Sequence, residues 1–141
     1  MKMSIAIPTC ESKGRGNEFL DDLFRTIEIQ TFKDYEVVVS DHSKNDDLVK
    51  VISEFQNKFN LLYVRNENDR GNGPANTNNA IDHCSGDIIK VMFQDDFFQN
   101  NEYFTLQNGM SSIIAKLDTI LDQHENIITI LSSSNSFNAF S

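Results

Sequence analysis

Apolar residues alternate along this chain between short contiguous runs and runs at helical spacing. Contiguous apolar runs predict strands, and four of them precede residue 100, at 4–8, 35–41, 61–66 and 87–93. Apolar positions three and four residues apart predict helices, which cover 18–30, 46–59 and the second half of a glycine-rich segment that ends near residue 86. The runs at 35–41 and 87–93 are so apolar that we expect both strands to be buried on both faces.

Beyond residue 99 the same pattern predicts one long helix and a last strand. The helix spans 103–123, and six apolar residues fall on one of its faces: Leu106, Met110, Ile113, Ile114, Leu117 and Leu121. The run NIITILSSS at 126–134 predicts the strand. We therefore expect 99–141 to add a helix and a last strand to the residues before it.

The alternation of strands and helices predicts right-handed βαβ units, and therefore an α/β fold with a mostly parallel sheet flanked by helices. A chain of 141 residues suits a single domain of this kind. Ligands of such sheets bind at the carboxyl ends of the strands. Thr9, Asp41 and the pair Asp95–Asp96 all come just after predicted strands, so we expect them to face one crevice.

The charge and composition argue against several kinds of partner. The formal net charge of −9 argues against nucleic acid and anionic membranes, because both require a basic surface. No apolar run approaches the roughly 18 residues of a membrane span, and the first residues resemble a strand rather than a signal peptide. The two cysteines, Cys10 and Cys84, lack the spacing of a thiol metal site or a disulfide framework. We therefore expect a soluble, cytoplasmic protein.

The segment VMFQDDFFQN (91–100) places two adjacent aspartates at the end of an apolar run. Neighbouring carboxylates repel, and burying either one without a partner would cost several kcal/mol. A hard cation such as Mg²⁺ or Mn²⁺ prefers carboxylate oxygens and often takes only one or two protein ligands beside phosphate oxygens. Asp95 and Asp96 therefore form a candidate metal site. The alternative is that one of them caps the following helix.

Asp41 and Arg70 are further candidates, each with two interpretations. Asp41 could accept hydrogen bonds from a base or a ribose, or it could cap the next helix or form a turn. Arg70, in the glycine-rich segment, could clamp a phosphate, or it could form a surface ion pair with Glu67 or Asp69. The glycines of this segment match neither the P-loop nor the dinucleotide pattern. The histidines are scattered, and we expect ordinary surface or turn roles for them, His42 included.

Four blocks of the sequence, taken in order, resemble one protein family. SIAIPTCE resembles the opening strand of family two glycosyltransferases, and LFRTIEIQTFKDYEVVVSDHSKND resembles the next helix, a Gln-Thr step and a Glu-led strand that ends in Asp. NENDRGNGPANTNNAIDHCSGDII is similar to the family's glycine turn and Ala-x-Asn-like helix. VMFQDDFF is similar to its metal-binding Asp-x-Asp motif, in the variant Gln-Asp-Asp. Together the blocks cover about residues 4 to 98.

The resemblance implies a Rossmann-like GT-A fold, of which this chain is the nucleotide-binding half. Members of the family transfer a sugar from a nucleotide-sugar donor, often UDP-linked, to an acceptor hydroxyl with inversion. The positions carried over as nucleotide-binding are Pro8, Thr9, Glu11, Asp41, Arg70 and Asp95. Asp96, helped by Asp95, would hold the Mn²⁺ or Mg²⁺ that bridges the diphosphate.

The chain also departs from the family pattern. Cys10 stands where an aromatic residue usually stacks on the base, Glu11 stands where Asn is common, and Gln94 replaces the first acid of Asp-x-Asp. The family's catalytic base lies in an acceptor-binding half well beyond the metal motif, and no segment in 99–141 matches it. The resemblance therefore implies one truncated domain over 1–141, a donor-binding half without an acceptor half.

Three functions are consistent with these observations. The first is a glycosyltransferase that binds a nucleotide-diphosphate sugar and acts on a glycan, lipid or protein acceptor. The second is a nucleotide-binding or interaction module without catalysis, which would pair through exposed apolar surface with another copy or a second chain. The third is a receiver-like, Mg²⁺-binding signalling domain. It fits poorly, because a receiver carries its acidic pair after the first strand.

Overall fold

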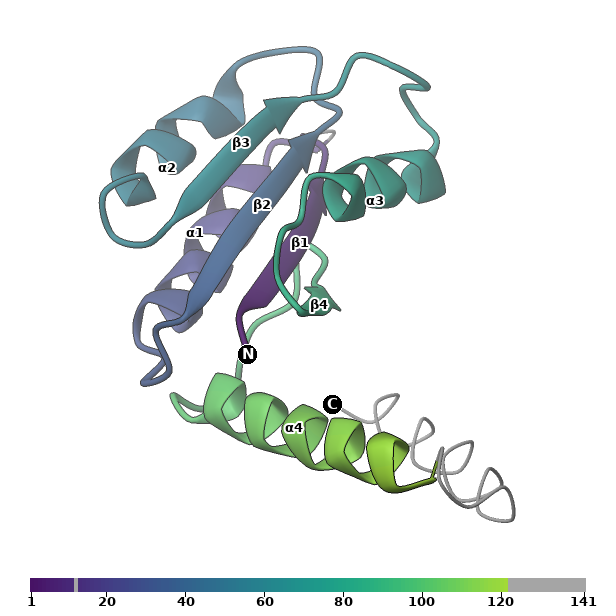
Figure 1. The fold of residues 1–141 in the computed structure, drawn as a ribbon. Helices are drawn as coiled ribbons and strands as arrows, with labels where there is room; N and C mark the ends of the chain where they lie inside the picture. Colours follow the sequence, from purple (N-terminus) through teal and green to yellow (C-terminus); the bar gives the residue numbers. More distant parts are fainter. Residues whose placement is uncertain (12, 122–141) are drawn as a thin grey trace. The chain divides into compact units, whose positions relative to one another are not determined.

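The computed structural model describes residues 1–11 and 13–121, in which strands and helices alternate in the predicted order (Figure 1). The elements are β1 (Met3–Thr9), α1 (Gly16–Glu28), β2 (Tyr35–Asp41), α2 (Asp47–Phe55), β3 (Leu61–Arg65), α3 (Gly73–Asp82), β4 (Ile88–Val91) and α4 (Tyr103–Leu121). The chain divides into two compact units, Met1–Thr105 and Leu106–Ser141. The first unit holds the whole sheet.

Four parallel strands form this sheet, in the order β3-β2-β1-β4. β1 and β2 pair along their whole length, from Met3 opposite Tyr35 to Thr9 opposite Asp41. α1 and α2 cover one face of the sheet and α3 lies on the other (Figure 1). The predicted α/β fold is thereby confirmed. The chain leaves β1 for β2 on one side and later returns to β4 on the other, so the strand order reverses between β1 and β4, where sheets of this kind bind ligands.

The hydrophobic core lies between the sheet and the helices α1 and α2. Helical spacing directs four residues of α1 inward, and all are fully buried: Leu20, Leu23, Phe24 and Ile27. The Phe24 ring meets that of Phe55 from α2 edge to face, with 5.1 Å between the centroids. β2 is buried along its whole length, as predicted. This core holds the strands whose carboxyl ends carry the candidate site.

β4 differs from its prediction. The sequence predicts a strand over 87–93 that is buried on both faces, but β4 spans only four residues, and Ile89 is 42% exposed. The prediction of two-sided burial is wrong because α3 packs mainly against β1 and β2. Within the described residues β4 is also an edge strand. Apolar composition alone does not reveal how far a covering helix extends.

The remaining boundaries agree with the sequence to within about two residues, apart from the ends of α2 and α3 and the last residues of the chain. α3 ends at Asp82 instead of near residue 86. α2 ends at Phe55 instead of residue 59, because 56–58 form a turn in which the Lys58 N–H donates to the Phe55 carbonyl. α4 begins at the predicted residue, and residues 122–123 and the predicted strand at 126–134 lie outside the described residues.

The described part of the second unit, residues 106–121, belongs entirely to α4. Leu106, Met110 and Ile113, which the sequence places on one face, are all exposed. Over residues 1–11 and 13–121, no helix is long and apolar enough to cross a membrane.

A buried carboxylate ties together the amino-terminal edge of the sheet. Glu36 on β2 accepts hydrogen bonds from the Ser4 hydroxyl and the Ser85 N–H, both at 2.6 Å. Nζ of Lys2 donates a third bond at 2.7 Å and also balances the charge. Gly86 follows directly, and its N–H donates to Ser4. A Cβ on Gly86 would lie 2.8 Å from the backbone of β1, so the close approach requires glycine.

Glu36→Gln is expected to lower the free energy of unfolding at neutral pH by about 2–3 kcal/mol. Burial disfavours the charged form, but the hydrogen bonds from Lys2, Ser4 and Ser85 outweigh it and lower the pKa of Glu36 from 4.5 to about 2. A carboxyl with a lowered folded-state pKa stabilises the fold above its unfolded pKa, and this stability is lost as the pH falls from 4.5 toward 2.

Urea unfolding followed by circular dichroism at pH 7 and pH 3 measures this effect. The difference between the unmodified chain and Glu36→Gln should shrink at pH 3. Glu54→Gln, on the exposed side of α2, is the control and should change stability by no more than about 0.5 kcal/mol. A difference for Glu36→Gln that is the same at both pH values would contradict the role of its charge.

Candidate functional site

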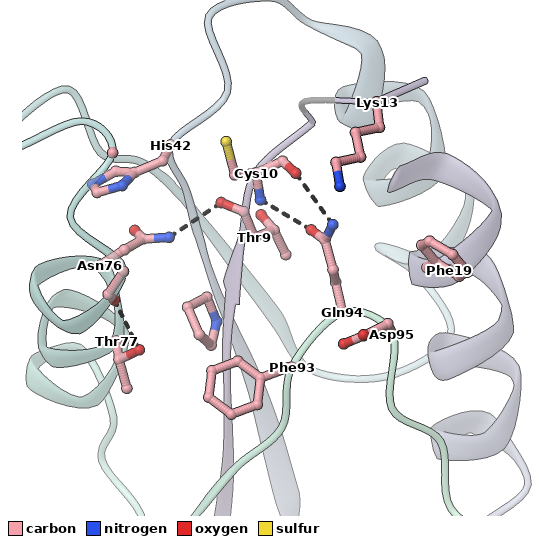
Figure 2. Close-up of a pocket in the computed structure, with 13 residues that line it drawn as sticks. Thr9, Cys10, Lys13, Phe19, His42, Asn76, Thr77, Phe93, Gln94 and Asp95 are labelled. Carbon is pink, nitrogen blue, oxygen red and sulfur yellow. Dashed lines mark hydrogen bonds between the residues drawn. The ribbon is translucent and has the colours of Figure 1, made fainter. Parts of the chain in front are cut away.

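A pocket of about 520 Å³ opens at the carboxyl ends of β1 and β4, where the strand order reverses (Figure 2). Its lining includes three residues that the sequence predicts, Pro8, Thr9 and Asp95. It also includes three that the sequence does not indicate, Lys13, His42 and Asn76. Thr9 and Asp95 therefore face one crevice, as expected from the strand ends, whereas Asp41 and Asp96 are not part of its lining.

The Gln94 amide joins the segment after β4 to the end of β1. Its Oε1 accepts from the Cys10 N–H at 2.9 Å, and its Nε2 donates to the Cys10 carbonyl at 3.1 Å (Figure 2). An amide side chain carries both donors and an acceptor, so it can bond to one backbone residue in both directions. Gln94 thereby fixes the neighbouring Asp95 at the pocket.

Asn76 on α3 holds the ends of β1 and β2 together from the other face of the sheet. Its Nδ2 donates to the carbonyls of Thr9 and Ser40, at 3.1 and 3.0 Å. Its Oδ1 accepts from the Ser40 hydroxyl at 2.7 Å and from Nδ2 of Asn66 at 3.3 Å. Asn76 is 3% exposed, and these four bonds use the full capacity of its amide.

His42 lies beside Asn76 on the pocket wall (Figure 2). The residue is 4% exposed. Its backbone N–H donates to the Thr9 carbonyl at 3.0 Å, and its Nε2 lies 2.9 Å from Nδ2 of Asn66. Of the expected surface or turn role, the surface position is therefore wrong, because the parallel pairing of β1 and β2 draws the residue after Asp41 into the site.

Asp95 and Asp96 lie in the turn that follows β4, and both side chains are exposed. The Asp96 carboxylate accepts from the Phe93 N–H at 3.1 Å, and the Asp96 N–H donates to the Phe93 carbonyl at 3.0 Å. Because both carboxylates are exposed, neither pays the cost of burying an unpaired charge. Neither aspartate caps the following helix, because α4 begins only at Tyr103.

The carboxylate oxygens of Asp95 and Asp96 are suitable ligands for a hard cation that also binds oxygens of a bound molecule. Exposed carboxylate oxygens at a pocket rim are the ligands that Mg²⁺ and Mn²⁺ prefer. The described residues contain no group of three or more His, Cys, Asp or Glu that could hold a metal on their own. A cation at Asp95 and Asp96 would therefore need further oxygens, such as those of a diphosphate.

Asp41 is fully buried at the end of β2, inside a polar cluster. Its Oδ1 accepts from the Ser43 N–H and its Oδ2 from the Tyr63 hydroxyl, both at 2.8 Å. Nε of Arg65 donates to the Tyr63 hydroxyl oxygen and lies 3.6 Å from Asp41 Oδ2. Burial and the bond to Asp41 raise the pKa of Tyr63 to about 12, so its phenol remains a donor. These contacts fit the turn interpretation of Asp41, and its contact with a nucleotide stays a prediction.

Glu11 and Arg70 also have partners within the chain. The Glu11 carboxylate accepts from the N–H groups of Gly14 and Gly16, both at 2.6 Å, and so holds the turn that leads into α1. Arg70 forms an ion pair with Glu67 at 3.5 Å. The pocket lining includes neither Glu11 nor Arg70, and their contacts with a nucleotide stay predictions.

The charge at the pocket is mixed. Among the described residues that line it, Lys13 alone carries a positive charge. Cys10, also in the lining, is not activated as a nucleophile, because burial and the carboxylates of Asp41 and Glu11 raise the pKa of its thiol. An anion in this pocket could thus be held by Lys13 together with a bound cation. The raised pKa of the Cys10 thiol does not favour a nucleophilic role.

Two curated glycosyltransferases are similar in sequence to most of this chain. The chain is 29% identical over 106 residues to the GalNAc(5)-diNAcBac-PP-undecaprenol beta-1,3-glucosyltransferase of Campylobacter jejuni, an alignment that covers 74% of the chain and 33% of the relative. It is 28% identical over 100 residues to the poly(ribitol-phosphate) beta-N-acetylglucosaminyltransferase TarS of Staphylococcus aureus, over 69% of the chain and 17% of the relative.

Solved structures show the same fold. The crystal structure of Staphylococcus aureus TarS superposes with a TM-score of 0.71 at 23% identity, covering 82% of this chain and 20% of that one. The mannosyltransferase PcManGT of Pyrobaculum calidifontis gives a TM-score of 0.59 at 22% identity, covering 71% of this chain and 29% of that one. These neighbours are GT-A glycosyltransferases, so the sheet and its helices have the GT-A fold.

The family assignment rests on most of the chain. This chain spans a third or less of the length of the curated relatives named above. A model of one family nevertheless matches it over residues 4–131, which includes the whole pocket and every residue of the sheet except Met3. The chain belongs to glycosyl transferase family 2.

Proposed function

We propose that the pocket between β1 and β4 binds the nucleotide of a nucleotide-diphosphate sugar, as the donor site of an inverting glycosyltransferase. The observation that carries this proposal is the position of Asp95 and Asp96, two exposed carboxylates in the turn at a pocket where the strand order reverses. Structures of TarS in complex with UDP and with UDP-GlcNAc, which superpose with TM-scores of 0.67 and 0.65, support a UDP-linked donor.

Within this proposal the six residues that the sequence predicts to bind the nucleotide would act in different ways. Pro8, Thr9 and Asp95 would contact the nucleotide directly, since they line the pocket. We infer an indirect part for Asp41 and Glu11, through the turns that their carboxylates hold. Arg70 would reach the nucleotide only by leaving its ion pair with Glu67, which is a weak surface contact.

Mn²⁺ or Mg²⁺ would be held by Asp96 and Asp95 together with oxygens of the diphosphate. The structure of PcManGT in complex with GDP-Man and Mn²⁺ supports a metal at such a site. When bound, the ion would neutralise charge on the diphosphate leaving group. Lys13 would add positive charge in the same pocket. Inverting transfer also needs a general base for the acceptor hydroxyl, and we assign that role to none of the described residues.

Titration calorimetry with UDP, in Mn²⁺ and in EDTA, tests the proposal. UDP is expected to bind in Mn²⁺ and to lose about tenfold or more in affinity when the metal is removed, because the diphosphate then faces two carboxylates without a cation. Uridine, which lacks the diphosphate, is the control ligand and should bind weakly with no dependence on Mn²⁺. Equal UDP affinity with and without metal would contradict the metal site. No binding of UDP or GDP under either condition would contradict the nucleotide site.

A further inference from the structure

The hydrogen bonds around the pocket determine which ring nitrogen of His42 carries a proton. The amide of Asn76 faces the carbonyls of Thr9 and Ser40 at 3.1 and 3.0 Å. A backbone carbonyl can only accept a hydrogen bond, so the group that faces both carbonyls must be the NH₂ of Asn76. The Oδ1 of Asn76 therefore points to Asn66.

The orientation of the Asn66 amide follows from that of Asn76. Oδ1 of Asn76 can only accept, so the Asn66 atom at 3.3 Å from it must be Nδ2. On the other side, the Asn68 N–H donates to Oδ1 of Asn66 at 3.1 Å, which a flipped amide could not allow. Nδ2 of Asn66 lies 2.9 Å from Nε2 of His42. A donor faces this ring nitrogen, so Nε2 accepts, and the imidazole is neutral with its proton on Nδ1.

The Nδ1–H of His42 is open to the pocket. His42 belongs to the pocket lining, and no hydrogen bond to its Nδ1 occurs within residues 1–11 and 13–121. Over the same residues, the buried side-chain nitrogen and oxygen atoms without a partner are Asn17 Oδ1 and Tyr103 Oη only. Nδ1 of His42 is not one of them, so this atom retains some exposed surface although the residue is only 4% exposed. The backbone bond to Thr9 and the contact with Asn66 hold the residue at both ends.

We propose that His42 determines base specificity, by donating its Nδ1–H to a carbonyl on the edge of the nucleobase. This inference rests on the proposed nucleotide site. A fixed donor selects an acceptor: uracil presents its O4 carbonyl where cytosine presents an NH₂, and cytosine would bring two donors face to face. A site built to form one hydrogen bond rejects the analogue that leaves its polar group unpaired. His42 thus favours a uridine diphosphate over a cytidine diphosphate.

Two substitutions distinguish the role of the Nδ1–H of His42 from that of the contact between its Nε2 and Asn66. His42→Gln can place an amide oxygen near the position of Nε2, where Asn66 donates, but it has no donor near the position of Nδ1. His42→Asn places an amide nitrogen near the position of Nδ1 but is too short to reach Asn66. UDP and CDP affinities are measured by titration calorimetry in Mn²⁺ for both variants and for the unmodified chain. Thermal unfolding establishes that each variant is folded.

The unmodified chain is expected to prefer UDP over CDP by about tenfold. This ratio should fall close to one in His42→Gln and persist in His42→Asn, even if His42→Asn is less stable. If His42 had only a structural role, its substitution would weaken the binding of UDP and CDP equally and leave the ratio of the two affinities unchanged. A ratio that survives in His42→Gln overturns the inference.

Nitrogen-15 NMR of the unmodified chain gives a second test that needs no variant. The His42 ring should show its proton on Nδ1, and the Nδ1 resonance should shift when UDP is added. A proton on Nε2 overturns the inference, and so does an Nδ1 resonance that saturating UDP leaves unchanged. Absence of any UDP or CDP binding to the unmodified chain contradicts the proposed nucleotide site, and the inference about His42 with it. Binding of UDP with an unchanged ratio in His42→Gln refutes the His42 inference alone.

Discussion

Asn76→Asp is expected to lower the free energy of unfolding by about 4 kcal/mol. The substitution replaces an NH₂ by a carboxylate oxygen, which would face the carbonyls of Thr9 and Ser40 at the 3.1 and 3.0 Å now spanned by hydrogen bonds. A buried charge would then meet two acceptors with no donor between them. Asn76→Ala removes the same donor without adding a charge, so its expected cost is smaller, about 2–3 kcal/mol.

Urea unfolding followed by circular dichroism compares these variants with Asn78→Asp. Asn78 lies on the same helix, is exposed and undergoes the same chemical change, so we expect its effect to stay within about 0.5 kcal/mol. Equal losses for Asn76→Asp and Asn78→Asp would mean that the amide of Asn76 does not hold β1 and β2 together.

Asp96→Asn is expected to weaken Mn²⁺-dependent UDP binding by about 10- to 100-fold, the range typical of losing a group that supports a metal. Asparagine keeps an oxygen that can accept from the Phe93 N–H, so the turn that now includes this bond at 3.1 Å is preserved. What the substitution removes is the negative charge that would help to hold the cation. In EDTA the effect on UDP affinity should reverse: Asp96→Asn should bind UDP more tightly than the unmodified chain, because it lacks a carboxylate that repels the diphosphate.

This reversal separates a metal ligand from a residue that merely shapes the pocket. Asp34→Asn removes one negative charge just before β2, at the opposite edge of the sheet from the pocket, and should leave both titrations unchanged. Weaker UDP binding by Asp96→Asn to the same extent in Mn²⁺ and in EDTA would contradict the metal role. Asp95→Asn is expected to behave like Asp96→Asn and, since Asp95 lines the pocket, to weaken UDP binding further.

The sequence predicts the scaffold of this site well because strands and helices leave periodic signals. β2 occupies 35–41 as predicted. The end of β1 and the segment that follows β4 line the same pocket. The rule that parallel strands present their carboxyl ends at one edge requires only the order of the elements. Thr9 and Asp95 can therefore be placed from the sequence without knowledge of any side-chain contact.

The network around Asn76 could not be predicted in this way. Asparagine is frequent in this chain, so no single asparagine stands out. Two of its partners are backbone carbonyls, of Thr9 and Ser40, and every residue has such a group. Only the register that brings β1 and β2 side by side makes this pair of carbonyls a binding site for one amide. His42 offers a partial signal, since it directly follows the last residue of β2.

Asp41 illustrates the opposite case. Its place at a strand end predicts a site residue, but its side chain is enclosed by Ser43, Tyr63 and Arg65. His42 follows Asp41 directly, yet it lines the pocket whereas Asp41 does not. A position at a strand end indicates the edge of the sheet but does not indicate on which face a side chain lies.

Gln94 gives the sheet a contact that the backbone of β4 does not supply. The pairing of β1 with β4 ends at Ala6 opposite Val91, yet beyond it the Gln94 side chain meets Cys10 with one donor and one acceptor, as a neighbouring peptide group would. A side-chain amide carries the same N–H donor and C=O acceptor as a peptide group, at the end of a side chain. The main chain can therefore turn away and expose its two carboxylates while it remains anchored like an edge strand. Two carboxylates that repel each other are thus tied to the end of β1 through the residue just before them.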